Sequence, residues 1–317
     1  MDDVDVRLCG MLILDSRISY RDLSDRLGLS IQAVHRRIQV LQAHDVIRGF
    51  TASLSFSYLN AAVAYIFGTS EAKSMDQVVQ ALSLDDRTYI VVVTGRNRLS
   101  IGAVLRDHSD LDDYVGFVKR EAKLTDLAIG LMSMTRVGAD RTAAADREAS
   151  LTPLDYRIVR TLKDDSRQPV EDIASELHVS AATARRRLSR LIDIGAISTT
   201  IDWHPSASGE IVAQLHIRMN QGADRSKVIN DLAGKSDGRI ISVITFSNLP
   251  DFIFLVVWAP TLKGIDEITG IVRDEGGVDS VFPDIIISEH RFDTWVDRLV
   301  AERAASGSVL KDHQQSR

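Results

Sequence analysis

The sequence predicts an α+β fold that is built twice, each copy being a three-helix unit with a following strand and then a ferredoxin-like βαββαβ unit. Three observations predict it. The chain has 317 residues, which is room for two or more domains. Residues 150 apart match over the first part of each half. The later part of each half then alternates β-branched runs with amphipathic segments in one recurring order. The chain is therefore expected to be a tandem duplication.

The repeat is clearest near the start of each copy. Sliding the sequence by 150 residues places Asp15-Ser16-Arg17 on Asp165-Ser166-Arg167, and Arg36-Arg37 on Arg186-Arg187. The register holds without a gap up to Ile47 and Ile197. Conservative partners preserve the apolar positions that a helical core needs. Chance does not explain a register that is kept for so long.

Three short helices are expected at the start of each copy. The first covers about 4–14, and in the second copy Thr152 is its N-cap with Pro153 in the first turn. Ser19 caps the second helix, and Gly28 supplies the left-handed residue that ends it. The third helices are expected over 30–43 and 180–193. Two helices joined by so short a turn are typical of a helix-turn-helix.

The third helix separates its residues into two faces. At about 100° per residue, Val34, Ile38 and Leu41 lie together, and the opposite face is polar. Arg and Gln suit bidentate hydrogen bonding to base edges, and Arg also neutralises phosphate. A plain solvated face is the alternative for either helix alone, but repetition of the Arg pair and its caps favours DNA. The predicted DNA-binding residues are Ser30, Gln32, His35, Arg36, Arg37, Gln39, Arg48, Ser180, Thr183, Arg185, Arg186, Arg187, Ser189 and Arg190.

Strands dominate the rest of each copy. A strand over 51–56 is expected to form a wing that contacts the DNA backbone. The βαββαβ elements are then expected at 63–67, 75–84, 89–94, 99–105, 109–121 and 127–134, and again at 211–217, 226–233, 239–245, 252–258, 263–275 and 281–287. The predicted domains are a winged helix-turn-helix at 1–58, a ferredoxin-like domain at 59–137, a linker at 138–150, a second winged helix-turn-helix at 151–203, a second ferredoxin-like domain at 204–290, and a C-terminal helix with a polar tail at 291–317.

Together these residues resemble the Lrp/AsnC family of leucine-responsive, or feast/famine, transcriptional regulators. Leu27-Gly28-Leu29-Ser30 and Val46-Ile47-Arg48-Gly49-Phe50 resemble the winged-helix signature, and Thr94-Gly95 with the βαββαβ region resembles the ligand-sensing RAM domain. The resemblance covers nearly the whole chain, twice. It implies a sequence-specific regulator that binds double-stranded DNA, takes an amino-acid effector, has no cofactor and is not an enzyme.

Family members ordinarily carry one unit and dimerise with their sheets face to face. Two fused units therefore imply an intramolecular pseudo-dimer that assembles further into a homo-oligomer, either a dimer of fused units or a larger one. The second wing departs from the pattern at Trp203-His204-Pro205, which leaves open whether the second DNA-binding head is active.

The resemblance places the effector site near the turn after the second strand. The corresponding residues are Thr94, Gly95, Asn97 and Ser100 in the first half and Thr245, Asn248 and Asp251 in the second. Phe246 stands where the family's Gly would sit, and Ser100 where an Asp is common. Whether either pocket binds an amino acid is left open by these departures.

Composition excludes several classes of protein. With 38 Lys and Arg against 44 Asp and Glu, the net charge of −6 excludes a basic protein that coats nucleic acid, so any DNA contact is local. The single Cys9 excludes a disulfide framework and a cysteine-built metal site. The acidic start is unlike a targeting peptide, and the apolar runs are too short for a membrane span. A cytoplasmic protein with no membrane partner is expected.

No catalytic or metal site is predicted. His35 and His44 lie out of phase on one helix and cannot share a metal ion. No phosphate loop or nucleophile elbow is present. One enzyme class stays open, because siroheme decarboxylases also resemble paired Lrp-type units; the basic face of the third helix favours the regulator. A third reading is an amino-acid-binding or assembly protein that has lost DNA binding.

Overall fold

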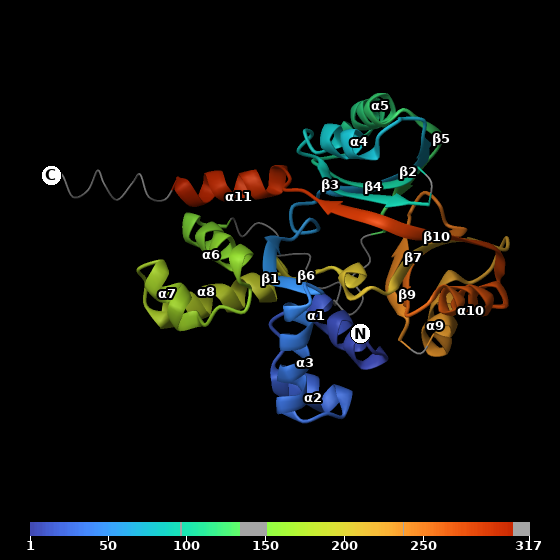
Figure 1. Ribbon diagram of the computed structural model, residues 1–317. Coiled ribbons are helices and arrows are strands. Elements are labelled where there is room, and N and C mark those ends of the chain that lie inside the picture. The colour runs from blue at the N-terminus through green and yellow to red at the C-terminus, as the bar shows by residue number, and fades with distance from the viewer. Residues whose placement is uncertain (96, 134–150, 237, 307–317) are drawn as a thin grey trace.

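The computed structural model describes residues 1–95, 97–133, 151–236 and 238–306 (Figure 1). Two three-helix units, the first head and the second head, flank a two-stranded ribbon, and a large sheet with helices on its outer side lies beside them. The predicted α+β class and its duplication are confirmed. The first head contains α1 (Asp3–Leu14), α2 (Tyr20–Leu27) and α3 (Ile31–Ala43), and the second head contains α6 (Pro153–Asp164), α7 (Val170–Glu176) and α8 (Ala181–Asp193).

The helix ends follow the predicted caps. Thr152 caps α6 with Pro153 in its first turn, and Ser19 caps α2. Gly28 ends α2 at φ +67°, the left-handed conformation that glycine adopts without strain. Ser30 and Ser180 cap α3 and α8 through the backbone N–H three residues on. These local predictions are confirmed because short polar side chains satisfy otherwise unpaired N–H groups.

The strands expected to form a separate wing on each head pair with each other instead. The strand β1 (Ile47–Leu54) pairs antiparallel with β6 (Ile197–Trp203), so each head contributes one strand to a shared ribbon. The α1 helix packs against β6 and the α6 helix against β1. A lone strand exposes its backbone hydrogen-bonding groups, and the second copy supplies the partner that satisfies them. The sequence of one copy cannot show such exchange.

The sheet joins both halves into one structure. Its order is β5-β2-β4-β3-β10-β7-β9-β8, and β10 (Val278–Arg291) pairs with β7 in its first part and with β3 in its second. The fused units therefore share a continuous sheet, because β10 continues past the expected end of its own strand. The other strands are β2 (Ala62–Ser70), β3 (Thr88–Thr94), β4 (Arg98–Leu105), β5 (Leu124–Leu131), β7 (Ile211–Met219), β8 (Ile240–Thr245) and β9 (Phe252–Ala259).

The two ends of this sheet also meet. The Ser133 N–H donates to the Thr245 carbonyl at 2.7 Å, and the Ser247 N–H donates to the Leu131 carbonyl at 2.8 Å. Inside lies a cluster of aromatic and β-branched side chains from both halves. It comprises Val63, Tyr65, Phe67, Ile244, Phe246 and Phe254. The inner faces of the two halves thus pack against each other, as the family resemblance implies.

Helices cover the outer faces. The first half carries α4 (Met75–Leu82) and α5 (Asp110–Ala122), and the second carries α9 (Arg225–Lys235) and α10 (Leu262–Arg273) (Figure 1). A short 3₁₀ turn (Pro205–Ser208) precedes β7, and α11 (Trp295–Ala305) follows β10 and returns to pack on α6. The predicted linker at 138–150 and the tail beyond residue 306 lie outside the described residues. Across the described ranges, no helix has the length and apolar character to cross a membrane.

Candidate nucleic-acid interface

The outer face of α3 presents polar side chains to solvent. Gln32, His35, Arg36 and Gln39 are exposed, whereas Val34, Ile38 and Leu41 are buried. The His35 ring lies edge-on to Tyr20 of α2 with ring centroids 5.5 Å apart. The face is therefore arranged as the sequence predicts, with His35 partly fixed against the neighbouring helix.

The α8 helix repeats this arrangement with a different set of polar side chains. Arg185, Arg186 and Ser189 are exposed, and Arg185 is paired with Glu171 of α7 at 2.7 Å. Thr183 is half-buried and its hydroxyl lies 2.9 Å from the Ser180 Oγ, so both contribute to the start of the helix. The two recognition helices thus share a backbone plan but offer different side chains.

Three further arginines of the predicted DNA surface, besides Arg185, are held by carboxylates of the same head. Arg37 Nη1 lies 2.6 Å from Asp5 Oδ1 and 2.8 Å from Asp2 Oδ2, and the hydrogen bond to Asp5 raises the pKa of Arg37. In the second head, Arg187 and Arg190 approach the fully buried Asp155 at 3.2 and 3.7 Å. These arginines tie the recognition helix to the first helix of its head, because a buried carboxylate requires a partner.

Arg36 and Arg186 occupy equivalent positions in the two recognition helices. Both are exposed, and among the described residues neither makes a hydrogen bond or an ion pair. Arg48 is also exposed on β1, with its Nη1 3.3 Å from His204 Nε2. A guanidinium without an internal partner keeps its five donors for a planar acceptor such as a phosphate or a guanine edge.

The predicted effector turn of the first half is closed by its neighbours. Thr94 and Ser100 are buried, and the Ser100 Oγ donates to the Gln214 Oε1 at 2.7 Å across the boundary between the halves. The Gly95 N–H donates to the Ile285 carbonyl of β10 at 3.0 Å. The Asn97 carbonyl accepts from Ser70 at 2.8 Å. These residues lie close together, and their polar groups form hydrogen bonds to neighbouring strands.

The equivalent turn of the second half is filled. Phe246 is fully buried in the aromatic cluster, and Thr245 carries the backbone bond that links β8 to residue 133. The Asn248 amide accepts from the Leu131 N–H at 2.7 Å and donates to the Ile129 carbonyl at 2.8 Å. Asp251 is exposed, and its carbonyl accepts from Met219. Neither turn lines the cavity of about 390 Å³ between β1, α6 and α11, or the cavity of about 350 Å³ beside Tyr156 and Arg303.

Sequence reasoning missed the role of the repeated Asp-Ser-Arg triplet. Ser16 Oγ and Ser166 Oγ lie 2.6 Å apart and both residues are fully buried. Arg17 donates to the carbonyls of Ser166 and Gln168, and Arg167 donates to the Ile18 carbonyl at 2.8 Å. Residues 150 apart therefore meet at a pseudo-twofold axis between the heads. The sequence feature that could have shown it is that the same triplet occurs in both copies, at a position outside the helices.

A buried polar group between the halves was also missed. His216 Nε2 lies 3.4 Å from Asp284 Oδ2, and Arg98 Nε lies 3.3 Å from the same oxygen. Burial, with a smaller contribution from Arg98, lowers the pKa of His216 to about 4. Across the described residues, no group of three or more His, Cys, Asp or Glu is placed to hold a metal ion.

Comparison with known proteins identifies the units. The AsnC-type helix-turn-helix domain matches residues 1–42 and again 151–192. The chain is 28% identical over 117 residues to an HTH-type transcriptional regulator of Pyrococcus abyssi, covering 36% of this chain and 80% of that protein. It is 29% identical over 142 residues to another from Pyrococcus horikoshii, covering 43% of this chain and 95% of that protein.

A likeness to a solved structure extends over nearly the whole chain. The siroheme decarboxylase NirDL superposes with a TM-score of 0.58 at 12% identity, covering 97% of this chain and 100% of that one. At this identity the likeness shows the fold, a tandem arrangement of Lrp-like units. The regulators named above match less than half of the chain, and the enzyme matches both halves together.

Proposed function

Because the chain consists of two tandem Lrp/AsnC-type units, we propose that it is a sequence-specific DNA-binding transcriptional regulator of the cytoplasm in which α3 and α8 enter major grooves. The observation that carries the proposal is the matched pair Arg36 and Arg186, exposed at the same turn of both recognition helices and without an internal partner. The neighbouring Arg37 and Arg187 are used internally, so the heads retain one free arginine each at this turn. A helix-turn-helix reads bases through such residues near the start of its second helix.

The two heads are proposed to read different half-sites. Gln32, His35 and Gln39 flank Arg36 on α3, whereas the corresponding positions of α8 are Ala182, Ser189 and Arg185, the last of which is paired with Glu171. Gln is suited to adenine edges and Arg to guanine edges, so the first head offers more base-reading groups. The expected operator is asymmetric, and the acidic chain binds DNA through few charges. A small-molecule effector and assembly into a homo-oligomer complete the proposal.

The test selects operator DNA from a random pool with the full-length protein and then compares single variants by gel shift at one salt concentration. Arg36→Ala and Arg186→Ala are each expected to weaken binding by about 1–3 kcal/mol, and each to relax base preference in one half-site only. Arg120→Ala is the matched control, because Arg120 is an exposed arginine of α5, far from the heads (Figure 1). Unchanged affinity in both head variants contradicts the proposal.

A second candidate function is decarboxylation of a tetrapyrrole. It is favoured by one observation, that the fold likeness to siroheme decarboxylase NirDL extends over 97% of this chain. In such a step a carbon–carbon bond to a carboxylate breaks, carbon dioxide leaves and a proton takes its place. Incubating the full-length protein with siroheme and following the loss of carbon dioxide by mass spectrometry tests it. Release of carbon dioxide from siroheme, together with failure to select any operator DNA, would support the enzyme and contradict the regulator.

A further inference from the structure

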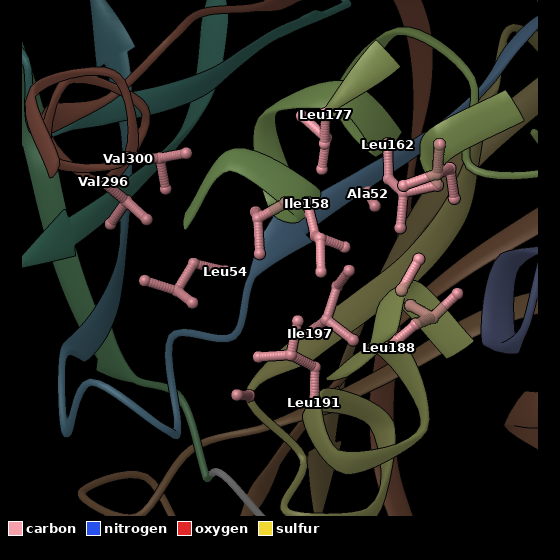
Figure 2. Close-up of a cluster of buried hydrophobic side chains, with 14 of the residues drawn as sticks. Ala52, Leu54, Ile158, Leu162, Leu177, Leu188, Leu191, Ile197, Val296 and Val300 are labelled. Carbon is pink, nitrogen blue, oxygen red and sulfur yellow. The ribbon is translucent and has the colours of Figure 1, made fainter. Parts of the chain in front are cut away.

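A cavity of about 390 Å³ lies between the second head and the C-terminal helix α11. Its floor is apolar and comes from three elements: Ala52 and Leu54 of β1, Val159 of α6, and Val296 and Val300 of α11. Figure 2 shows Val296 and Val300 reaching from α11 toward Leu54 and the side chains of α6. The volume is within the range that small-molecule sites occupy.

At the corresponding place in the first head, larger side chains belong to the core. There the strand behind α1 is β6, and its buried Ile201 and Trp203 belong to the core of the first head together with Trp258. Behind α6, the corresponding strand β1 supplies the smaller Ala52 and Leu54. Packed interiors tolerate few voids, so large side chains close one site while small side chains leave the other open.

Among the charged side chains that line the cavity, Arg160 is the one without a partner in the part of the chain that the structure describes. Lys163 Nζ lies 2.7 Å from Asp293 Oδ1 and 2.9 Å from Asp297 Oδ1, so both aspartates are already paired. Arg298 is paired with Asp86 at 3.3 Å. Arg160 also lines the cavity, is exposed, and makes no hydrogen bond or ion pair to any residue that the structure describes. A ligand group that pairs with Arg160 therefore carries a negative charge.

We propose that this cavity binds a small carboxylic acid with a branched aliphatic tail. The tail lies on the valine and leucine floor, and the carboxylate accepts two parallel hydrogen bonds from the Arg160 guanidinium. The pairing with Arg160 distinguishes the ligand from a neutral alcohol of the same shape.

Ligand binding in this cavity is expected to regulate DNA binding by the second head alone. This part of the proposal rests on the proposed function. The ligand contacts α6, the ribbon and α11 together, so it favours the orientation of the second head in which all three are in place. The first head, closed by tryptophans, is not affected. Binding is therefore expected to change the affinity for the half-site read by α8 and to leave the half-site read by α3 unchanged.

Calorimetric titration of the full-length protein with 4-methylpentanoate, in the absence of DNA, tests the site itself. We expect saturable binding that Arg160→Gln weakens about tenfold, the loss of a charge-assisted hydrogen bond. Ala301→Trp, at an exposed position of α11 that lines the cavity, is expected to abolish binding while the melting temperature shows that the protein is folded. Arg120→Gln, at an exposed arginine of α5, is the matched control and is expected to bind as the wild type does.

Other outcomes overturn the site or its ligand class. Absence of heat with the wild type, or wild-type affinity in both Arg160→Gln and Ala301→Trp, excludes the cavity as the site. Binding of 4-methylpentanol at least as tight as that of 4-methylpentanoate overturns the ligand class. Because no DNA is present, these results are independent of the regulator proposal, whose own failure is seen in the gel shifts of Arg36→Ala and Arg186→Ala.

Discussion

The two heads have the same helices and differ in what lies behind them. Each recognition helix is capped by a serine, tied to the first helix through an arginine, and left with one free arginine. The first head is closed at its back by Trp203 and Trp258, whereas the second is backed by α11 around a cavity. The two copies have thus kept the caps and the arginine pair of the recognition helix and differ in what packs behind it. The two heads are expected to bind DNA by the same means and to be regulated differently.

The largest expected difference between the units is in the carboxylate that holds each recognition helix. Asp155 is fully buried, pairs with Arg187 and Arg190, and forms part of the capping box of α6. In the first head, Asp2 and Asp5 pair with Arg37 and cap α1, and both lie nearer the surface. We expect Asp155→Ala to lower the free energy of unfolding by about 3 kcal/mol, since it leaves two cations without their partner. Asp5→Ala is expected to cost only about 1 kcal/mol.

Urea denaturation of the full-length variants measures both values. Asp155→Asn is the matched control, because it keeps the shape of the side chain and a cap oxygen but removes the charge. Equal losses for Asp155→Ala and Asp5→Ala would show that the two ties are equivalent and that the difference in burial has no energetic consequence.

The second prediction concerns the inner sheet, where Phe67 in β2 lies beside His216 in β7 with ring centroids 5.4 Å apart. Burial lowers the pKa of His216 to about 4, below its ordinary value of 6.5. Between these values the unfolded chain binds more protons, so the free energy of unfolding falls as the pH drops from about 6.5 to 4, by roughly 3 kcal/mol. The raised pKa of the neighbouring Asp284 acts in the opposite direction.

His216→Phe removes the titrating group and makes the two halves alike at this position. The variant is expected to lose most of the acid sensitivity, measured as melting temperature against pH between 4 and 7. His108→Gln, at an exposed histidine, is expected to keep the wild-type slope. A slope that is unchanged in His216→Phe would place the acid-sensitive group elsewhere.

The third prediction concerns the seam where the ends of the sheet meet. A Cβ at Gly130 of β5 would lie 2.4 Å from the Phe246 ring, so this glycine accommodates an aromatic ring from the other half. Gly130→Ala is expected to cost about 1–3 kcal/mol in free energy of unfolding through overpacking. The cost is expected to disappear in a Phe246→Ala background, because the two residues are coupled.

Gly116→Ala on α5 is the control for this pair. A Cβ there meets nothing within 4 Å, and the exposed helix is expected to gain about 0.5–1 kcal/mol. If Gly130→Ala costs the same with and without the Phe246 ring, the contact is not what requires the glycine.

Local sequence rules predicted most of the helices and strands, and little of how the two halves pair with each other. The caps at Ser19, Ser30 and Thr152 follow from unpaired N–H groups within a few residues, so the sequence of one copy is enough to predict them. The pairing of β1 with β6 and of β10 with β3 depends on residues far apart in the chain, and periodicity does not specify a partner.

The candidate sites show the same limit. Helical spacing placed Gln32, Arg36 and Gln39 on the open face of α3, as the structure has them. It did not show that Arg37 and Arg187 are held by carboxylates, because that depends on where α1 and α6 cross the recognition helices. The cavity beside α11 depends on small residues of β1 meeting a helix from the far end of the chain, and no local pattern contains that information.

The smallest expected effect tests where the two heads are alike. Ser16 and Ser166 meet at the pseudo-twofold axis with hydroxyls 2.6 Å apart, and each is the partner of the other in a fully buried place. Ser16→Ala and Ser166→Ala are therefore each expected to lower the free energy of unfolding by about 1 kcal/mol, since either change leaves one buried hydroxyl unpaired. Replacing both removes the pair entirely, so the double variant is expected to cost no more than either single one. Urea denaturation of the three variants, with the exposed Ser189→Ala as control, measures this coupling. Unequal single losses would mean that the axis is symmetric in geometry but not in energy, and that the difference between the heads extends to the contact they share.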